Sequence, residues 1–498
     1  MSQLPLILSI VPLVLFVILL LHYKLTLFRV SFITLIATAL LAVFYWQIEP
    51  SYAGLSFGKG FFIALDIAII VAGAIFFLNI LTRLNILDNI SRHLENISKD
   101  YRVQVLILAW LFESFLEGTA GFGTPAAVVA PLLIAIGLPP LKAVIIGLLG
   151  NSTAVVFGAA GTPIRVGFAG LDIAQVPGLA VWLNFIGLIV PVFILWTLVA
   201  DRREAKKEFF EALPFALWTG FAFVLPSALA VGLGQEFPSI IGGLIGLGLV
   251  IFTIRFKIFT PLTVRRIRDV TIVPNRQDSL WLDFLPYFIL VALLVAGKFL
   301  VGAGGLAIPL LSGQQIAFFN PGYAFIIAGA LTAIFWRVKF RNTARSAGNA
   351  IAKTLGTFAV IAVMSSLVQI MINAKHNLSG LASPIEIIAK VFEVAWLPFL
   401  APFVGAFGSF LTGSATVSNL LFGNFFSTAA QALNFDTAKI LALGVVGAAA
   451  GNMIALADIL AAETVVGLRH QERAVLRGVI IPCLVYLTLA GAIGLLIV

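Results

Sequence analysis

Long apolar stretches follow one another along almost the whole chain, and this pattern restricts the fold more than any other feature. A helix of about 20 apolar residues crosses the roughly 30 Å hydrocarbon core of a bilayer while pairing its own backbone groups. The sequence therefore predicts an all-α polytopic membrane protein with about twelve transmembrane helices. The predicted spans are residues 4–22, 27–47, 60–82, 141–158, 178–200, 212–234, 238–254, 281–301, 321–336, 356–373, 438–456 and 478–498.

Charged residues are scarce and lie mainly between these stretches. Only 11% of the residues are charged and 61% are apolar, whereas about 25% of a soluble protein is charged. The net charge of +9 comes from Lys and Arg in short connecting segments, which is where cytoplasmic loops of membrane proteins carry them. We therefore expect the lipid bilayer, and no nucleic acid, as a partner.

Motifs for metal, nucleotide or cofactor binding are missing from the sequence. Cys483 is the single cysteine, which excludes an internal disulfide and a cysteine-built metal site. There is no P-loop, no dinucleotide fingerprint and no soluble domain that could hydrolyse ATP. We expect a protein that is not an enzyme, binds no cofactor and has no metal site.

The basic segments predict the orientation of the chain. If all of them are cytoplasmic, both termini lie on the periplasmic or extracellular side of a bacterial inner membrane. This assignment requires that the stretches 103–137 and 398–424 enter and leave on the same side, as re-entrant hairpins. The basic segments are residues 24–29, 83–102, 202–207, 255–268, 337–345 and 469–477.

The same topology relates the two halves of the chain. Residues 26–200 and 321–498 repeat the order span, span, hairpin, broken helix, span, and an odd number of crossings separates equivalent elements. The halves are therefore predicted to be inverted repeats. The predicted divisions are a first repeat over 1–254 with hairpin 103–137 and two extra helices in 212–254, a cytoplasmic basic linker over 255–280, and a second repeat over 281–498 with hairpin 398–424.

A seven-residue motif occurs once in each hairpin. The pattern Ser-Phe-Leu-x-Gly-x-Ala runs from Ser114 to Ala120 and again from Ser409 to Ala415. Glycines release a helix, and the free N–H groups at a following helix start favour a carboxylate. Close helix packing through small residues is the alternative. The predicted substrate-binding residues of the two tips are Gly118, Thr119, Ala120, Gly121, Gly123, Thr124, Thr412, Gly413, Ser414, Thr416, Ser418 and Asn419.

A broken helix is predicted to follow each hairpin and to face its tip. The first contains Asn151, Ser152 and Thr153, and the second contains Asn452. We add these four residues to the predicted substrate site, with a packing kink as the alternative. Arg165 follows the first break and could grip a carboxylate with two hydrogen bonds or snorkel to the interface.

Four carboxylic acids at predicted membrane depth are candidates for proton coupling: Glu113, Glu117, Asp66 and Asp458. Ionisable groups at this depth are costly and often functional. Burial disfavours the charged form of a carboxyl group, so Glu113 or Glu117 could carry a proton near neutral pH. The alternative is a structural ion pair with Lys or Arg from the facing repeat.

Residues 112–126, which read FESFLEGTAGFGTPA, resemble the signature of the bacterial lactate permease family. The stretches 147–153 and 158–163 are similar to those that follow it in that family. The resemblance implies a secondary transporter that imports short 2-hydroxymonocarboxylates such as L-lactate, D-lactate and glycolate together with protons. Analogy with other paired-hairpin carriers suggests an elevator-type mechanism and a possible homodimer.

Two other functions remain open at this point. Hydroxyl, amide and carbonyl oxygens also bind sodium, so a sodium-coupled carboxylate or anion transporter, or a sodium–proton antiporter, would suit the same scaffold. A membrane-embedded enzyme or a channel fits less well. The sequence places no histidine or cysteine for catalysis at membrane depth, and an internally duplicated site is unlike a channel's ring of residues.

Overall fold

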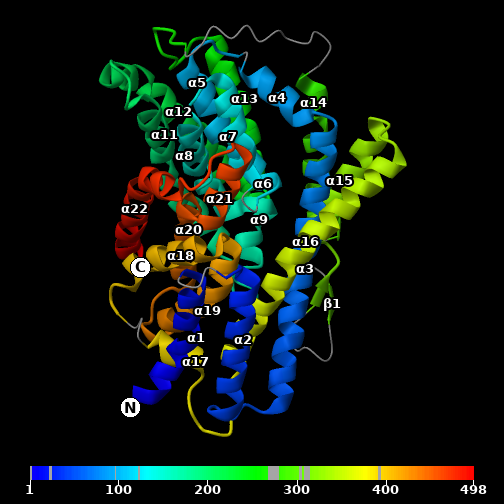
Figure 1. Cartoon of the computed structure of the whole chain (residues 1–498), viewed down its shortest axis with the longest axis vertical. Coiled ribbons are helices and arrows are strands. Elements are labelled where there is room, and N and C mark those ends of the chain that lie inside the picture. Colours follow the sequence, from blue (N-terminus) through cyan, green and yellow to red (C-terminus); the bar gives the residue numbers. More distant parts are fainter. Residues whose placement is uncertain are drawn as a thin grey trace.

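The computed structural model describes residues 3–21, 25–95, 97–121, 124–266, 280–301, 305–307, 315–390 and 394–498. Within these residues the chain is helical apart from one pair of short antiparallel strands (Figure 1). Strand β1 (Gly305–Ala307) pairs with β2 (Gln315–Ala317), with Gly305 opposite Ala317. The predicted linker 255–280 is described only as far as residue 266 and again at residue 280.

Along the chain, the helical elements form a first series, a short middle part and a second series. The first series is α1 (Gln3–Leu21), α2 (Leu27–Phe44), α3 (Pro50–Arg83), α4 (Ile86–Glu95), α5 (Tyr101–Leu106), η1 (Ile107–Phe112), α6 (Glu113–Thr119), α7 (Thr124–Ile136), α8 (Pro140–Gly150), η2 (Thr153–Phe157), α9 (Gly158–Arg165), α10 (Val176–Leu183), η3 (Asn184–Ile189) and α11 (Val190–Val199). The helices between are α12 (Ala205–Ala230), η4 (Val231–Leu233) and α13 (Pro238–Arg255). The second series is α14 (Leu280–Ala296), η5 (Gly297–Val301), α15 (Pro321–Phe335), α16 (Phe340–Asn373), α17 (Pro384–Ala389), α18 (Leu397–Thr412), α19 (Ala415–Ala432), α20 (Thr437–Gly451), η6 (Asn452–Ile454), α21 (Leu456–Val465) and α22 (Glu472–Ile497).

Among the described residues, nine helical segments are long and apolar enough to cross a membrane. A tenth is counted if α8 and the segment Thr153–Arg165, which meet at a 46° bend, form one broken span. The chain is therefore a multi-pass membrane protein. The first and ninth predicted spans correspond to shorter apolar helices, at Leu4–Leu19 and Pro321–Phe335.

Two helices of 34 residues each, α3 and α16, pack along one another at the centre of the fold. Glycines allow the close approach: a Cβ at Gly60 would lie 2.3 Å from Ser366 Oγ, and one at Gly73 would lie 2.5 Å from the Gly322 carbonyl oxygen of α15. Both helices begin earlier than predicted. The expected loop at 48–59 is largely the first turns of α3, because Pro50 fits the start of a helix.

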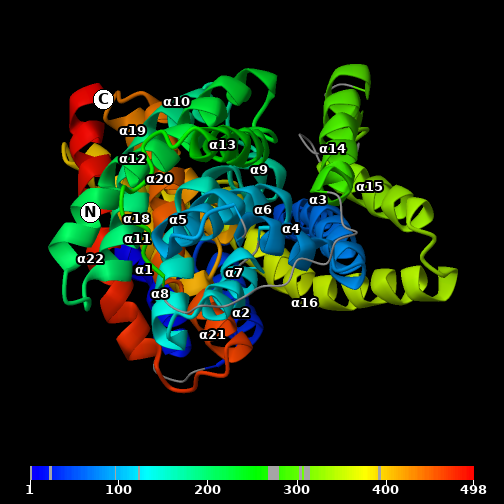
Figure 2. The same ribbon diagram turned by 90° about the horizontal axis from the view of Figure 1, so that it is seen from above.

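The remaining helices form a larger body beside this pair, and α14 and α15 lie on the opposite side of α3 (Figure 2). The segment Thr437–Val465 runs through the middle of that body, since 83% of its most apolar window is buried. The corresponding value for Leu282–Val301 is 28%. The largest apolar core therefore surrounds α20, where small residues let α18 pack closely: a Cβ at Gly447 would lie 2.0 Å from the Pro402 carbonyl oxygen.

Candidate functional site

The first predicted hairpin is a buried helical segment that ends at a glycine. Residues 101–119 are helical through α5, η1 and α6, and α6 closes with a hydrogen bond from the Ala120 N–H to the Leu116 carbonyl. Gly121 then takes a left-handed conformation with φ +51°. Helix α7 runs onward from Thr124. We call residues 118–124 the first tip; Gly123 and the Thr124 side chain lie outside the described part of the structure.

The second predicted hairpin has a tighter turn, which we call the second tip (residues 412–416). Helix α18 ends at Gly413, whose φ of +70° is left-handed, and α19 begins two residues later. The Ser414 side chain accepts a hydrogen bond from the Val417 N–H and so caps α19. A Cβ at Gly413 would lie 2.6 Å from Ala457 Cβ. The second tip therefore contacts the start of α21.

The first broken helix contains a strained backbone turn. Helix α8 ends at Gly150, and Asn151 leaves the helical conformation with ψ +64°. Ala159, Ala160 and Gly161 are all left-handed, with φ of 41°, 53° and 78°. A left-handed residue with a side chain costs roughly 1–2 kcal/mol, and such strain collects at functional sites. We call residues 151–161 the first break.

The second broken helix is less distorted. Asn452 keeps a helical conformation with φ −63° at the end of α20 and begins the single turn η6. The chain becomes extended only at Ala455, with ψ +121°, before α21 begins. We call residues 452–455 the second break. The two breaks therefore differ in backbone conformation.

The structure brings both tips' helices and both breaks together at one small crevice. Glu117 of α6 enters it from the first hairpin, and Asn452 enters it from the second break. A hydrogen bond of 2.9 Å from Asn419 Nδ2 to the Pro163 carbonyl joins the second hairpin to α9. The lining residues are Glu117, Val155, Gly158, Ala159, Thr162, Pro163, Gly413, Ser414, Ala415, Thr416 and Asn452.

Each hairpin glutamate lies against a glycine of the first broken helix. A Cβ at Gly158 would lie 2.1 Å from Glu117 Oε1, and a Cβ at Gly150 would lie 2.6 Å from Glu113 Oε2. Both glutamates are buried, with exposed fractions of 3% and 0%. Glu117 interacts electrostatically with Glu113 and with Asp458 of α21. The three acidic side chains therefore form a buried series from α6 to α21.

Many buried polar atoms around this series have no hydrogen-bond partner among the described residues. Native proteins pair nearly all such atoms, so each exception needs an explanation. Many of the exceptions belong to the two hairpins and the two broken helices, which is the arrangement expected where a polar ligand, water or proton completes the bonding. They include both carboxyl oxygens of Glu113, Glu117 Oε2, both amide atoms of Asn151, Asn419 Oδ1, Asn452 Oδ1, Asp458 Oδ2, Ser114 Oγ and Ser409 Oγ.

Several predicted ligands use their hydroxyl groups within the protein. Thr119 donates to the Leu116 carbonyl at 3.0 Å, and Ser152 donates to the Leu149 carbonyl at 2.8 Å. Thr412 donates to the Gly408 carbonyl at 2.8 Å, and Ser418 donates to the Gly405 carbonyl at 2.7 Å. Thr153 differs: it packs against η3, where a Cβ at Gly187 would lie 2.4 Å from its Oγ1, and this hydroxyl has no hydrogen-bond partner among the described residues. The other four hydroxyl groups therefore stabilise the backbone around the site and do not point to a ligand.

Asp66 and Arg165 are paired with each other outside the crevice. Arg165 Nη2 lies 3.5 Å from Asp66 Oδ2, and Asn320 Nδ2 donates to Asp66 Oδ1 at 2.7 Å. This ion pair differs from the alternative predicted for Asp66, because Arg165 belongs to the same half of the chain and not to the facing one. It links α9, which carries the first break, to α3 and α15.

Thr162 is not among the site residues predicted from the sequence, but it lines the crevice. Its hydroxyl donates a 2.6 Å hydrogen bond to the Ala159 carbonyl inside the strained turn. The glycines and the proline of residues 158–163 are the sequence feature that indicates a site residue in this stretch. Arg102 belongs to the basic segment 83–102 that the sequence predicts to be cytoplasmic, and its side chain is fully buried. Arg102 binds both carboxyl oxygens of Asp100 and the Thr263 carbonyl, which fixes the start of the first hairpin to the described part of the predicted linker.

A family model and the known proteins that resemble this chain all indicate the same class of protein. A family model described as L-lactate permease matches residues 5–300 and 313–498. An L-lactate permease of Streptococcus iniae is 30% identical over 452 residues, covering 86% of this chain and 92% of that protein. A glycolate permease of Escherichia coli is 28% identical, covering 93% and 90%. An L-lactate permease of Bacillus subtilis is 27% identical, covering 83% and 81%.

Proposed function

Because the chain belongs to the L-lactate permease family, and is therefore a transport protein rather than an enzyme, we propose that it is a proton-coupled symporter. Its substrates are short 2-hydroxymonocarboxylates, namely L-lactate, D-lactate and glycolate, imported across the bacterial inner membrane. The names of its relatives support lactate and glycolate as substrates. The observation that carries the proposal is the buried Glu117 carboxyl, whose Oε2 has no hydrogen-bond partner among the described residues, in a crevice where both halves of the chain meet.

The substrate carboxylate would lie at the start of α19. The N–H groups of Ala415 and Thr416 open this helix and have no acceptor within it, and the helix dipole favours an anion there. Both residues line the crevice. The 2-hydroxyl group would bind the unpartnered Asn452 Oδ1 on the opposite wall. The crevice is small, and Gly158 and Ala159 take up little of its space, which suits a short acid.

Proton coupling would follow from the position of Glu117 beside this anion. Two negative charges about 4 Å apart repel by roughly 4 kcal/mol at an effective dielectric constant near 20. Substrate would therefore bind well only when Glu117 is protonated, so one proton would travel with each acid. Glu113 and Asp458 both interact with Glu117 in the buried series. They would pass the proton from Glu117 toward either side of the membrane.

The wider architecture belongs to the same proposal. We propose twelve spans, two re-entrant hairpins, inverted repeats over 1–254 and 281–498, and termini on the periplasmic or extracellular side. The recurrence of one element order and the equal lengths of α3 and α16 support the repeats. In an elevator-type cycle, the body with the tips and breaks would move against α3, α15 and α16. A homodimer would form through the scaffold.

Uptake into proteoliposomes tests this function. Purified protein would be reconstituted with an inward proton gradient and no sodium, and labelled L-lactate, D-lactate and glycolate would be followed. We expect accumulation that an uncoupler abolishes and that unlabelled glycolate inhibits. Uptake that needs sodium and ignores the proton gradient would contradict proton coupling, while no uptake of any of the three acids would contradict the substrate class.

A further inference from the structure

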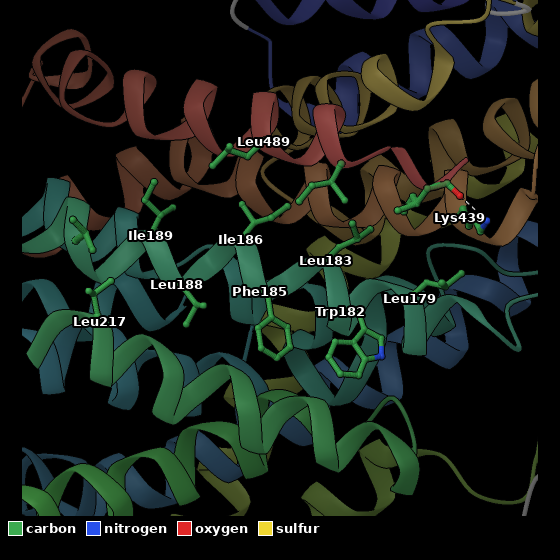
Figure 3. A pocket seen from close by; sticks show the side chains of 13 residues that line it. Leu179, Trp182, Leu183, Phe185, Ile186, Leu188, Ile189, Leu217, Lys439 and Leu489 are labelled. Carbon is green, nitrogen blue, oxygen red and sulfur yellow. Dashed lines mark hydrogen bonds between the residues drawn. The ribbon is translucent and has the colours of Figure 1, made fainter. Parts of the chain in front are cut away.

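A second cavity lies on the outer surface of the helical body, away from the crevice. It has a volume of about 770 Å³ and lies between α10, η3, α12, α20 and α22 (Figure 3). Its described lining is apolar or aromatic except for Lys439. Trp182 is 67% exposed and Leu217 is 47% exposed, so the groove opens outward. In a membrane protein this opening faces lipid.

The groove has the length of one lipid chain. Leu179 and Lys439 lie at one end, and Ile189 and Leu217 lie at the other (Figure 3). The ten steps along the eleven residues from Leu179 to Ile189 rise by roughly 15–20 Å in α-helical and 3₁₀ geometry. One leaflet contributes about 15 Å of hydrocarbon. The groove therefore reaches from a membrane surface to about the middle of the bilayer.

The surface end carries one cation and one anion. Lys439 Nζ donates to the Ile497 carbonyl at 2.6 Å, and it lies 4.0 Å from Asp436 Oδ2. The other Asp436 oxygen, Oδ1, caps α20 by accepting from the Ala438 N–H at 2.9 Å. Both side chains are partly exposed, at 31% for Lys439 and 41% for Asp436. Trp182, stacked on Phe185 at 5.3 Å, lies near the same end, as aromatic residues at membrane interfaces do.

We propose that this groove is a binding site for a zwitterionic aminophospholipid of the phosphatidylethanolamine class. One acyl chain would fill the apolar groove, the phosphodiester would bind Lys439, and the primary amine of the headgroup would bind Asp436. A lipid with an anionic headgroup and no amine would satisfy Lys439 and leave its negative charge near Asp436. The charge pair at the mouth therefore favours the aminophospholipid. This site does not depend on the proposed transport function.

Native mass spectrometry of the delipidated full-length protein tests the site. Phosphatidylethanolamine and phosphatidylglycerol with the same acyl chains would be titrated separately. We expect wild-type protein to retain more of the first, and Lys439→Gln to lower its retention by about fivefold, since one basic residue at a membrane surface contributes about 1 kcal/mol. Asp436→Asn would reduce the preference between the two lipids. Ile186→Trp would fill the groove and lower retention of both.

Two controls keep the result specific. Lys390→Gln removes an exposed lysine directly after α17, and Leu225→Trp enlarges an exposed side chain of α12 outside the groove. Neither should change lipid retention. Equal binding of the two lipids by wild-type protein, or unchanged retention in both Lys439→Gln and Ile186→Trp, would overturn the proposal. Loss of a dimer mass in Ile186→Trp with unchanged lipid binding would assign the groove to a second copy instead and would also overturn it.

Discussion

The Glu117 carboxyl group lies directly against the α-carbon of Gly158, so closely that a Cβ there would lie 2.1 Å from Oε1. This contact joins the first hairpin to the first break and holds an acidic group at the edge of the crevice. Only glycine permits it, because any side chain at residue 158 would displace the carboxyl group. The position of Glu117 therefore depends on a residue 41 positions away in the sequence.

We expect Gly158→Ala to lower the rate of proton-driven lactate uptake by about tenfold or more, since overpacking costs roughly 1–3 kcal/mol. The measurement is initial uptake into proteoliposomes at matched protein density. Gly178→Ala on α10 is the control, because no described atom lies within 4 Å of a Cβ built there. Equal rates in Gly158→Ala and wild type would show that the contact is not needed for transport.

Gly150→Ala should destabilise the protein. A Cβ at Gly150 would lie 1.8 Å from the Ala109 carbonyl oxygen and 2.6 Å from Glu113 Oε2, so α8 would have to move away from η1 and α6. We expect a clear fall in the thermal unfolding midpoint in detergent. Gly147→Ala, one helical turn earlier, should change it little, because its nearest neighbour would be the Ala126 carbonyl oxygen at 3.5 Å. The same midpoint for both variants would refute this packing argument.

Asn419→Ala should weaken the first break. It removes the 2.9 Å hydrogen bond to the Pro163 carbonyl and leaves that buried oxygen unpaired, at a cost of roughly 1–3 kcal/mol. We expect a raised KM for lactate and faster proteolysis or labelling near residues 158–163. Thr464→Ala is a control, since its exposed hydroxyl bonds only to the Leu460 carbonyl of its own helix. An unchanged KM in Asn419→Ala would show that this hydrogen bond does not contribute to substrate binding.

A double-mutant cycle tests whether Asp66 and Arg165 act as an ion pair. If the two side chains act on each other, Asp66→Asn and Arg165→Gln should slow transport by similar factors, and the double variant should be no slower than either. KM should then change little. An increase in KM in Arg165→Gln alone would instead mean that Arg165 binds the substrate carboxylate, as its place after the first break suggested.

The sequence predicts the helical membrane fold well, because long apolar stretches allow few other structures. It also predicts helix ends at the two tips, since glycines such as Gly121 and Gly413 release a helix locally. Contacts between distant segments were harder to foresee. The left-handed turn at Ala159 and Ala160 contains two residues with side chains, so no local preference indicates it. The pairing of Asp66 with Asn320 and Arg165 depends on how α3, α15 and α9 pack.

Site assignment from residue type alone included several hydroxyl groups that bond to their own helix. Ser152 and Thr412 are examples. A hydroxyl group near a helix break can serve the backbone or a ligand, and sequence does not separate these roles. The glutamates differ, because a buried carboxyl group without a partner is costly and is kept only where it is used.

The most direct test of Glu117 as the coupling residue compares two transport modes in the Glu117→Gln variant. The amide resembles the protonated carboxyl group, so substrate should still bind. We expect exchange of labelled for unlabelled lactate at equal pH on both sides to persist, while a proton gradient no longer drives accumulation. Accumulation at the wild-type level in Glu117→Gln would show that the proton travels elsewhere and would contradict the proposed coupling.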